Sequence, residues 1–591
     1  MAHSLSTLPM QRLERQVVSS SVTTLRFPAS GTFQQMKNLP SGSRHIAITI
    51  IGKNRADDSA EDYNLIRFNG DSGNNYNMIR YDCHTGDNQT GFTEYGVTSF
   101  SQAGHNCTGN HADTANIFQA STWLFPHALI DTGFDNTFLA FGGNPDNAFT
   151  AASRLRLGHG RWDDDGSHDP IEYIEFIMSD SGNWADNTVA TLAVVDEDYN
   201  SNTETVSGSD GTITHGSLGA SPENIAIIST VKGSRDYTID ALEVQLNADT
   251  TASNFAATLI DAREGAVASG VGANNSSVEI NGSGSTTAAD HAGNHLIQIQ
   301  QSGNTTGRGS FYSLSGHVDD ANAGDFDALL RIGAAQWANT ATVTSVKFEG
   351  ESSGNENLKV GSTSDLYISP PAEYLLDSKV VSSVAYLDFD LSDYDIPDCS
   401  TDLKLIIYGA GDSSDTGSSF NLQFAAEGGS IDTTASNYFT QNLTYASDAS
   451  VAGAVTTSNA SIGRVPGASG PHSDQMGGAT VTVFEWANTG MHKPFHVFGS
   501  SVNSAGNTTD IGSRIYVGRW ANTAAIGNIR ITGDSDGTDF RDGTVVELYS
   551  TYGTDAAIVS GAKTGKLAKV NGVAPHSATE QQDTRVNGIL I

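Results

Sequence analysis

Apolar and polar residues alternate in short runs along this chain, as in Ile-Arg-Ile-Thr at 529–532 and Val-Lys-Phe-Glu at 346–349. Clusters of Gly, Asn, Ser and Asp separate the runs roughly every 8–15 residues, as turns separate short strands. Stretches such as HIAITIIG at 45–52 are apolar over their whole length. The repeated part of the chain lacks the 3.6-residue period of a helix. This pattern predicts an all-β protein made of antiparallel sheets.

A tryptophan followed by an apolar strand occurs three times. The sequence reads GRWANTAAIGNIRITG at 518–533, AQWANTATVTSVKFEG at 335–350 and GRWDDDGSHDPIEYIEF at 160–176. We expect each tryptophan to fill the core at a hairpin corner, because a fold-defining position is repeated more readily than a ligand site. A sugar-stacking site is the alternative. The expected core residues are Trp162, Trp337 and Trp520, with Ile174, Val346 and Ile529 in the strands that follow.

Other landmarks recur in the same order, with a period of roughly 180 residues, which is too long for a solenoid repeat. For example, DTTASNF at 249–255 returns as DTTASNY at 432–438. Each repeat is therefore predicted to be a whole antiparallel β-sandwich domain of jelly-roll-like type. The predicted division is an N-terminal arm at 1–20, sandwich domains at 21–198, 206–370 and 374–557, and a C-terminal arm at 558–591.

The N-terminal arm holds the one predicted helix. Pro9 suits a first helical turn, and Met10, Leu13 and Val17 would share one face. Both arms carry a small positive charge, in contrast to the acidic remainder of the chain. We therefore expect an arm to dock on a neighbouring subunit or on another protein, through Met10, Arg12, Leu13, Arg15 and Val17. The alternative is that the arms pack on their own chain.

Composition and charge narrow the function. Charged residues make up only 17% of the chain and the net charge is −36. Such a surface repels phosphate backbones, so no nucleic-acid partner is expected. The N-terminus lacks the apolar core of a signal peptide, and no apolar run is long enough for membrane insertion.

Three longer tracts carry a resemblance: LIRFNGDSGNNYNMIRY at 65–81, GRWANTAAIGNIRITG at 518–533 and GTVVELYST at 543–551. They resemble a β-rich module of structural and tail-fibre-like virion proteins of tailed bacteriophages, of the marine and cyanophage type. The resemblance implies repeated β-sandwich modules and no catalytic signature. The first repeat departs from the module in its tryptophan strand, and the second has VQLNADTTASNF where the module has RFNGD.

Candidate chemistry is sparse. The GDSG tract at 70–73 is interpreted as a hairpin turn rather than a protease nucleophile loop, because a serine nucleophile also needs a placed His and Asp. For the aspartate-rich tracts at 163–169 and 534–539, calcium binding is a minor alternative, because their carboxylates lie near a glycine. Neither tract has the spacing of an EF-hand loop. We expect no cofactor. One cluster is interpreted as ordinary polar loop residues, with zinc ligation or a disulfide between its two cysteines as the alternatives: Cys83, His84, His105, Cys107 and His111.

Together these features predict a non-enzymatic structural component of a bacteriophage virion, as a fibre, knob or decoration on tail or capsid. It would assemble in the host cytoplasm and be exposed on the extracellular particle. The expected partners are further copies in a homotrimer, other phage head or tail proteins, and a host surface glycan. The alternatives are a carbohydrate-binding adhesin and a tailspike-type glycan depolymerase.

Overall fold

The structure is a computed structural model. The ranges described are 8–20, 22–53, 61–84, 89–108, 116–144, 154–163, 168–179, 182–208, 211–218, 224–234, 239–251, 254–263, 266–275, 277–283, 291–300, 309–318, 328–350, 357–368, 375–381, 384–396, 400–412, 417–445, 455–467, 476–501, 512–533 and 540–550. In these ranges the strands are accompanied by three short 3-10 helices, η1 (Phe33–Gln35), η4 (Glu197–Tyr199) and η6 (Leu391–Asp393).

The strands fall into three consecutive sets of twelve, here called units 1, 2 and 3. Unit 1 comprises β1 (Met10–Val17), β2 (Thr24–Phe27), β3 (Ile46–Gly52), β4 (Glu61–Phe68), β5 (Tyr76–His84), β6 (Gln89–Val97), β7 (Phe100–Thr108), β8 (Gln119–Phe125), β9 (Asn136–Asn144), β10 (Arg154–Trp162), β11 (Ile174–Met178) and β12 (Val189–Val195). Unit 2 comprises β13 (Asn200–Thr205), β14 (Ile213–His215), β15 (Asn224–Val231), β16 (Ile239–Leu246), β17 (Phe255–Arg263), β18 (Ala266–Asn275), β19 (Val278–Ser283), β20 (Gly293–Gln300), β21 (Gly309–Val318), β22 (Ala328–Trp337), β23 (Val346–Gly350) and β24 (Thr363–Ile368). Unit 3 comprises β25 (Leu375–Val380), β26 (Tyr386–Asp390), β27 (Leu403–Gly409), β28 (Gly417–Ala426), β29 (Tyr438–Tyr445), β30 (Val455–Thr457), β31 (Ala460–Pro466), β32 (Gly477–Val483), β33 (Lys493–Ser501), β34 (Gly512–Trp520), β35 (Ile526–Thr532) and β36 (Val545–Ser550).

Each unit has one eight-stranded and one four-stranded sheet, and the strand order is the same in all three. In unit 1 the orders are β1-β12-β3-β8-β9-β10-β5-β6 and β2-β11-β4-β7, and units 2 and 3 repeat them strand for strand. The paired strands are antiparallel throughout, as between β12 and β3. The expectation of an all-β protein of antiparallel sheets is therefore confirmed.

A separate apolar core lies between the two sheets of each unit. In unit 1 this core contains Phe68, Phe138 and Phe176, among many others, and units 2 and 3 have corresponding cores. Alternate residues of the eight-stranded sheet point into it, as expected for a strand. The opposite face of the same sheet is also buried, which explains why β3, β8 and β12 are buried at every position.

That opposite face belongs to a central core shared by all three units. The strands β9, β21 and β33 contribute to both kinds of core. Each has an aromatic residue in its unit core, namely Phe138, Phe311 and Phe495. Three residues further along, each places an apolar side chain in the shared central core. These central residues are Phe141, Leu314 and Phe498. The ring of Phe141 meets that of Phe498 with centroids 4.6 Å apart.

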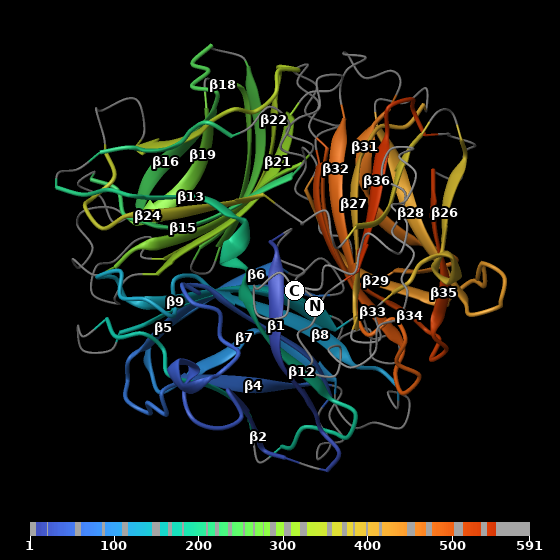
Figure 1. The fold of residues 1–591 in the computed structure, drawn as a ribbon, viewed down its shortest axis with the longest axis horizontal. Helices are drawn as coiled ribbons and strands as arrows, with labels where there is room; N and C mark the ends of the chain where they lie inside the picture. Colours follow the sequence, from blue (N-terminus) through green and yellow to red (C-terminus); the bar gives the residue numbers. More distant parts are fainter. Residues whose placement is uncertain are drawn as a thin grey trace, which may run out of the picture.

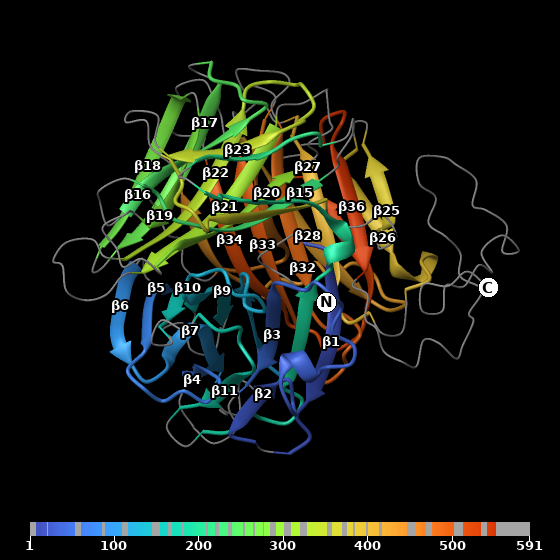
Figure 2. The same ribbon diagram turned by 60° about the vertical axis from the view of Figure 1, so that its left-hand side comes forward.

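The contacts between units run in one direction around a ring. Strand β10 of unit 1 contacts β21 of unit 2, the equivalent β22 contacts β33 of unit 3, and the equivalent β34 contacts β9 of unit 1. Figure 1 shows unit 1 in blue, unit 2 in green and unit 3 in orange around a common centre, and Figure 2 shows the same packing after a rotation about the vertical axis. A single chain thus forms a ring with approximate three-fold symmetry.

Two local expectations are wrong. Residues Met10–Val17 form the edge strand β1 and not a helix, because pairing with β12 satisfies their backbone groups and buries Met10 and Leu13. The turn at 70–73 does not close a hairpin either. It joins β4 of the four-stranded sheet to β5 of the eight-stranded sheet.

Candidate functional site

A buried cluster of His and Asp side chains lies at the junction of units 1 and 2. His45 directly precedes β3, and His127 follows β8 in a turn with φ of 53°. Asp365 belongs to β24 of unit 2. All three side chains are buried, and their ligand atoms lie within 4.8 Å of one another.

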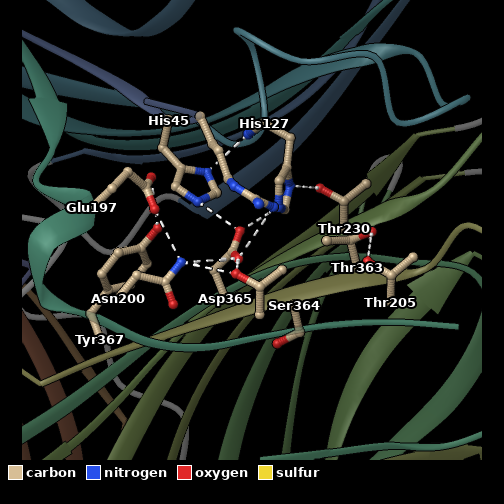
Figure 3. Close-up of polar contacts among 12 residues, drawn as sticks. His45, His127, Glu197, Asn200, Thr205, Thr230, Thr363, Ser364, Asp365 and Tyr367 are labelled. Atoms are coloured by element: carbon tan, nitrogen blue, oxygen red, sulfur yellow. Dashed lines mark hydrogen bonds and ion pairs between the residues drawn. The ribbon is translucent and has the colours of Figure 1, made fainter. Parts of the chain in front are cut away.

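Asp365 accepts a hydrogen bond from each ring. Its Oδ2 lies 3.0 Å from Nε2 of His45 and 2.9 Å from Nε2 of His127, as drawn in Figure 3. Its other oxygen, Oδ1, accepts from the hydroxyl of Thr203 and, at 3.3 Å, from the amide of Asn200. The guanidinium of Arg44 lies 3.6 Å from the same oxygen. Oδ2 therefore bonds across the junction to unit 1, whereas the hydrogen bonds to Oδ1 come from unit 2 itself.

The surroundings set the ionisation of the cluster. Burial, and the nearby charge of His127, lower the pKa of His45 to about 4, although the contact with Asp365 opposes the shift. Burial alone would raise the pKa of Asp365, but hydrogen bonds from His127 and His45 hold it well below its usual value. The cluster thus favours a carboxylate and a neutral His45 ring.

A metal ion does not fit this cluster. The backbone N–H of His127 donates to Nδ1 of His45 at a distance of 2.9 Å, so the proton of the neutral His45 ring must sit on Nε2. A metal at Nε2 would require the proton on Nδ1, where it would face that N–H. Asp365 is already occupied by the donors described above. The arrangement is therefore a polar link between units.

The other two junctions use the same positions with different residues. In the strand register, Asn224 and Asp402 take the place of His45, and Glu547 takes the place of Asp365. At the junction of units 2 and 3, the amide of Asn224 donates to Glu547 at 3.2 Å. Junction corners are therefore a repeated feature of this fold.

At the junction of units 3 and 1, Glu485 takes the place of His127 and Arg15 takes that of Thr203. The backbone N–H of Glu485 donates to Asp402 at 2.7 Å, as that of His127 donates to His45. Arg15 reaches both carboxylate oxygens of Glu485 at 2.9 Å.

Three of the predicted arm residues are buried within the chain. Met10 is in the central core, Leu13 is in the core of unit 1, and Arg12 is 4% exposed. Arg15 is bound to Glu485 of unit 3. Only Val17 stands out, at 49% exposed. The C-terminal arm at 558–591 lies outside the described residues.

Of the five residues proposed as alternative zinc ligands, only the side chain of Cys83 lies within the described structure. This side chain is buried on the central face of β5, and its Sγ lies 3.4 Å from Nε2 of Gln441 in unit 3. Strand β7, which carries His105 and Cys107, belongs to the four-stranded sheet on the other side of β5. Cys83 is in no disulfide in the described structure, which speaks against the alternative of a Cys83–Cys107 bridge. His111 and the side chains of His84, His105 and Cys107 lie outside the described residues.

The aspartate-rich tracts are only partly described. Residues 164–167 and 534–539 lie outside the described ranges. Asp163 lies 3.9 Å from the guanidinium of Arg161, and His168 lies 3.4 Å from Asp135.

The three repeated tryptophans are buried, with exposed fractions of 5%, 1% and 0% for Trp162, Trp337 and Trp520. Each ends a strand of the eight-stranded sheet, and the chain then crosses to the four-stranded sheet, so this corner is not a hairpin. Ile174, Val346 and Ile529 are fully buried in the three unit cores.

Each tryptophan also holds an aspartate through its indole N–H. The acceptor oxygens are Oδ2 of Asp71, Asp249 and Asp432, at 2.7, 2.9 and 2.8 Å respectively. An asparagine side chain shares the same oxygen in all three units. In the first unit this aspartate belongs to the GDSG tract, whose role is thus to anchor Trp162.

Sequence reasoning missed the junction residues. His45 and Asp365 are 320 residues apart, and no local motif marks either of them. The signal that could have found them is positional: an alignment of the three repeats places His45, Asn224 and Asp402 together just before an apolar strand.

Comparisons with known proteins add little. No protein-family model and no curated protein matches the chain. Among solved structures, domains LG4-5 of the mouse laminin alpha1 chain align at 8% identity over 64% of this chain and 97% of theirs, with a TM-score of 0.14. The C2A and C2B domains of Extended-Synaptotagmin 2 align at 7% identity over 51% of this chain and 95% of theirs, with a TM-score of 0.09. Such low scores support no conclusion about fold or function. Among the described residues, no helix is long and apolar enough to cross a membrane.

Proposed function

We propose that this protein is a non-enzymatic structural component of a bacteriophage virion, exposed on the particle as a fibre, knob or decoration of tail or capsid. The observation that carries the proposal is the ring of three units, which share one buried core within a single chain. Such a ring matches the three-fold symmetry common in phage appendages. The resemblance of 65–81 and 518–533 to virion modules points the same way.

The finer architecture belongs to the same proposal. Each unit would be one jelly-roll-like sandwich domain in a tandem array that arose by triplication. The repeated indole–aspartate contact at Trp162, Trp337 and Trp520 supports a common origin, because hydrogen-bonded side chains recur at matching places.

The polar side chains of the described part favour a structural role over a hydrolytic one. His45, His127 and Asp365 are buried, so a substrate could not reach them without separation of the units. The cavity bounded by Leu296, Tyr312 and Phe498 lies in the central core and is too small for anything beyond about one water molecule. The repeated tryptophans present no open ring for sugar stacking.

Location in the particle tests the proposal. Virions of the source phage would be purified by density gradient, and this protein would be sought by mass spectrometry and by immunogold electron microscopy. We expect a fixed number of copies per particle and surface labelling. Detection in infected-cell lysate but not in particles, with a replication enzyme as the reference for non-virion protein, would contradict the proposal.

The homotrimer stays a prediction. Sedimentation tests it, since a lone 62.1 kDa species at micromolar concentration would contradict it. Glycan-array binding by the purified chain would favour the adhesin instead, and release of reducing ends from host polysaccharide would favour the depolymerase.

A further inference from the structure

Histidines are unevenly distributed among the three junctions. In the described ranges, six lie where unit 1 meets its neighbours: His45, His127, His159, His291, His492 and His496. The described contacts between units 2 and 3 use hydroxyl, amide and carboxylate groups instead. There, the hydroxyl of Tyr312 lies 2.7 Å from that of Thr480, and Asn224 donates to Glu547.

Two of these rings have no space and no partner for a second proton. The Nδ1 atom of His159 donates to the carbonyl of Phe138 at 2.9 Å, while Nε2 has no hydrogen-bond partner in the described structure. This ring lies so close to β21 that a Cβ on Gly316 would come within 2.4 Å of it. Protonation of His159 would therefore place an unpaired charge in the junction with unit 2.

His496 is in the same situation at the junction with unit 3. Its Nε2 donates to the carbonyl of Ala120 in unit 1 at 3.1 Å, and its Nδ1 has no hydrogen-bond partner in the described structure. The rings of Phe141 and Phe484 lie on either side, each with its centroid 4.7 Å away. No described charged group faces this ring, so a proton on Nδ1 would be surrounded by apolar side chains.

Neighbouring charges mostly disfavour protonation. The positive charge of Arg161 disfavours a proton on His159. His291 lies beside Arg161 and 3.9 Å from Asp135. Arg519 and Lys493 both act on His492. At the remaining site His45 faces His127, Arg44 and one carboxylate, that of Asp365.

Protonation therefore disfavours both junctions of unit 1, through His159 towards unit 2 and through His496 towards unit 3. Burial lowers the pKa of His159 and His496 to about 3. In an opened junction these rings would meet water and regain their ordinary pKa of about 6.5. Below that pH the open form binds more protons than the closed form, so acidification favours opening.

We propose that unit 1 is joined to units 2 and 3 by histidine-lined junctions that loosen in acid, while the junction between units 2 and 3 stays closed. The chain would respond to acidification by releasing one unit of the ring and exposing part of the central core. This inference does not depend on the virion proposal.

Hydroxyl-radical footprinting of the full chain tests the inference. Oxidation would be compared between about pH 7.5 and about pH 5, with far-UV circular dichroism as the check on the sheets. We expect oxidation of Tyr81 and Phe141, on the central face of unit 1, to rise several-fold at the lower pH. Tyr312, bonded to Thr480 across the other junction, should stay protected. Equal labelling of all three residues, or none before the sheets unfold, would overturn the proposal.

Variants separate titration from packing. The double variant His159→Gln and His496→Gln removes two of the protonation sites, and we expect its opening to require a lower pH. The matched control is His215→Gln, because His215 is equally buried but bonds to Ser364 inside unit 2. A merely structural role would change protection equally at both pH values. If the double variant does not fold, the wild-type footprint still decides.

Discussion

The repeated tryptophan has two roles: its ring fills a unit core, and its N–H donates to an aspartate in a turn between the two sheets, which in unit 2 is the turn from β16 to β17. We expect Trp337→Ala to lower the free energy of unfolding by about 3–5 kcal/mol, as for a large core truncation. Trp337→Phe keeps most of the volume and should cost about 1–2 kcal/mol for the lost hydrogen bond. Denaturant unfolding measures both; equal losses would contradict separate roles for ring and N–H.

The aspartate gives an independent measure of the same contact. Burial alone would raise the pKa of Asp249, but hydrogen bonds from Trp337 and Asn254 lower it to about 2. A carboxyl group with a depressed pKa stabilises the folded state at pH values above its ordinary pKa, and this contribution is lost as the pH falls towards 2. Trp337→Phe should therefore raise the pKa of Asp249, which a carboxyl NMR titration would detect.

Among the elements, strand β1 carries the clearest prediction, because it links unit 1 to unit 3. Its Arg15 is paired with the Glu485 carboxylate, which is 5% exposed. Burial raises the pKa of Glu485 and the charge of Arg15 opposes that shift. We expect Arg15→Gln to cost about 1–3 kcal/mol, since it leaves a buried carboxylate without its cation.

A double-mutant cycle supplies the control. Adding Glu485→Gln to Arg15→Gln removes the unpaired charge, so the double variant should be more stable than the sum of the two single losses predicts. Additive losses would mean that Arg15 and Glu485 do not interact in solution.

The whole molecule should be sensitive to mild acid. Burial lowers the pKa of His45 and His215 to about 4 and that of His159, His295 and His496 to about 3. The unfolded chain, with histidine pKa values of about 6.5, binds more protons over this interval, so stability falls as the pH falls. Each such ring contributes a slope of up to about 1.4 kcal/mol per pH unit. Unfolding curves from about pH 8 to pH 5 check this, and a flat profile would contradict it.

The sequence predicted those features that depend on neighbours along the chain. Alternation along strands and the recurrence of tryptophan were sufficient for an all-β chain. The N-terminal strand was mistaken for a helix because Met10, Leu13 and Val17 have helical spacing, while its partner β12 lies far away in the sequence. The junctions were missed for the same reason, since His45 meets Asp365 only after two units have folded and packed.

The ring of three units also has a kinetic and evolutionary consequence. Because peptide bonds connect the units, closure of the ring is intramolecular and independent of protein concentration, and dilution cannot separate the units. A substitution changes one junction rather than three identical ones. The three corners already carry different residues: His45 with Asp365, Asn224 with Glu547, and Arg15 with Glu485. A covalent ring can thus acquire a distinct response at one junction while the other two keep it closed.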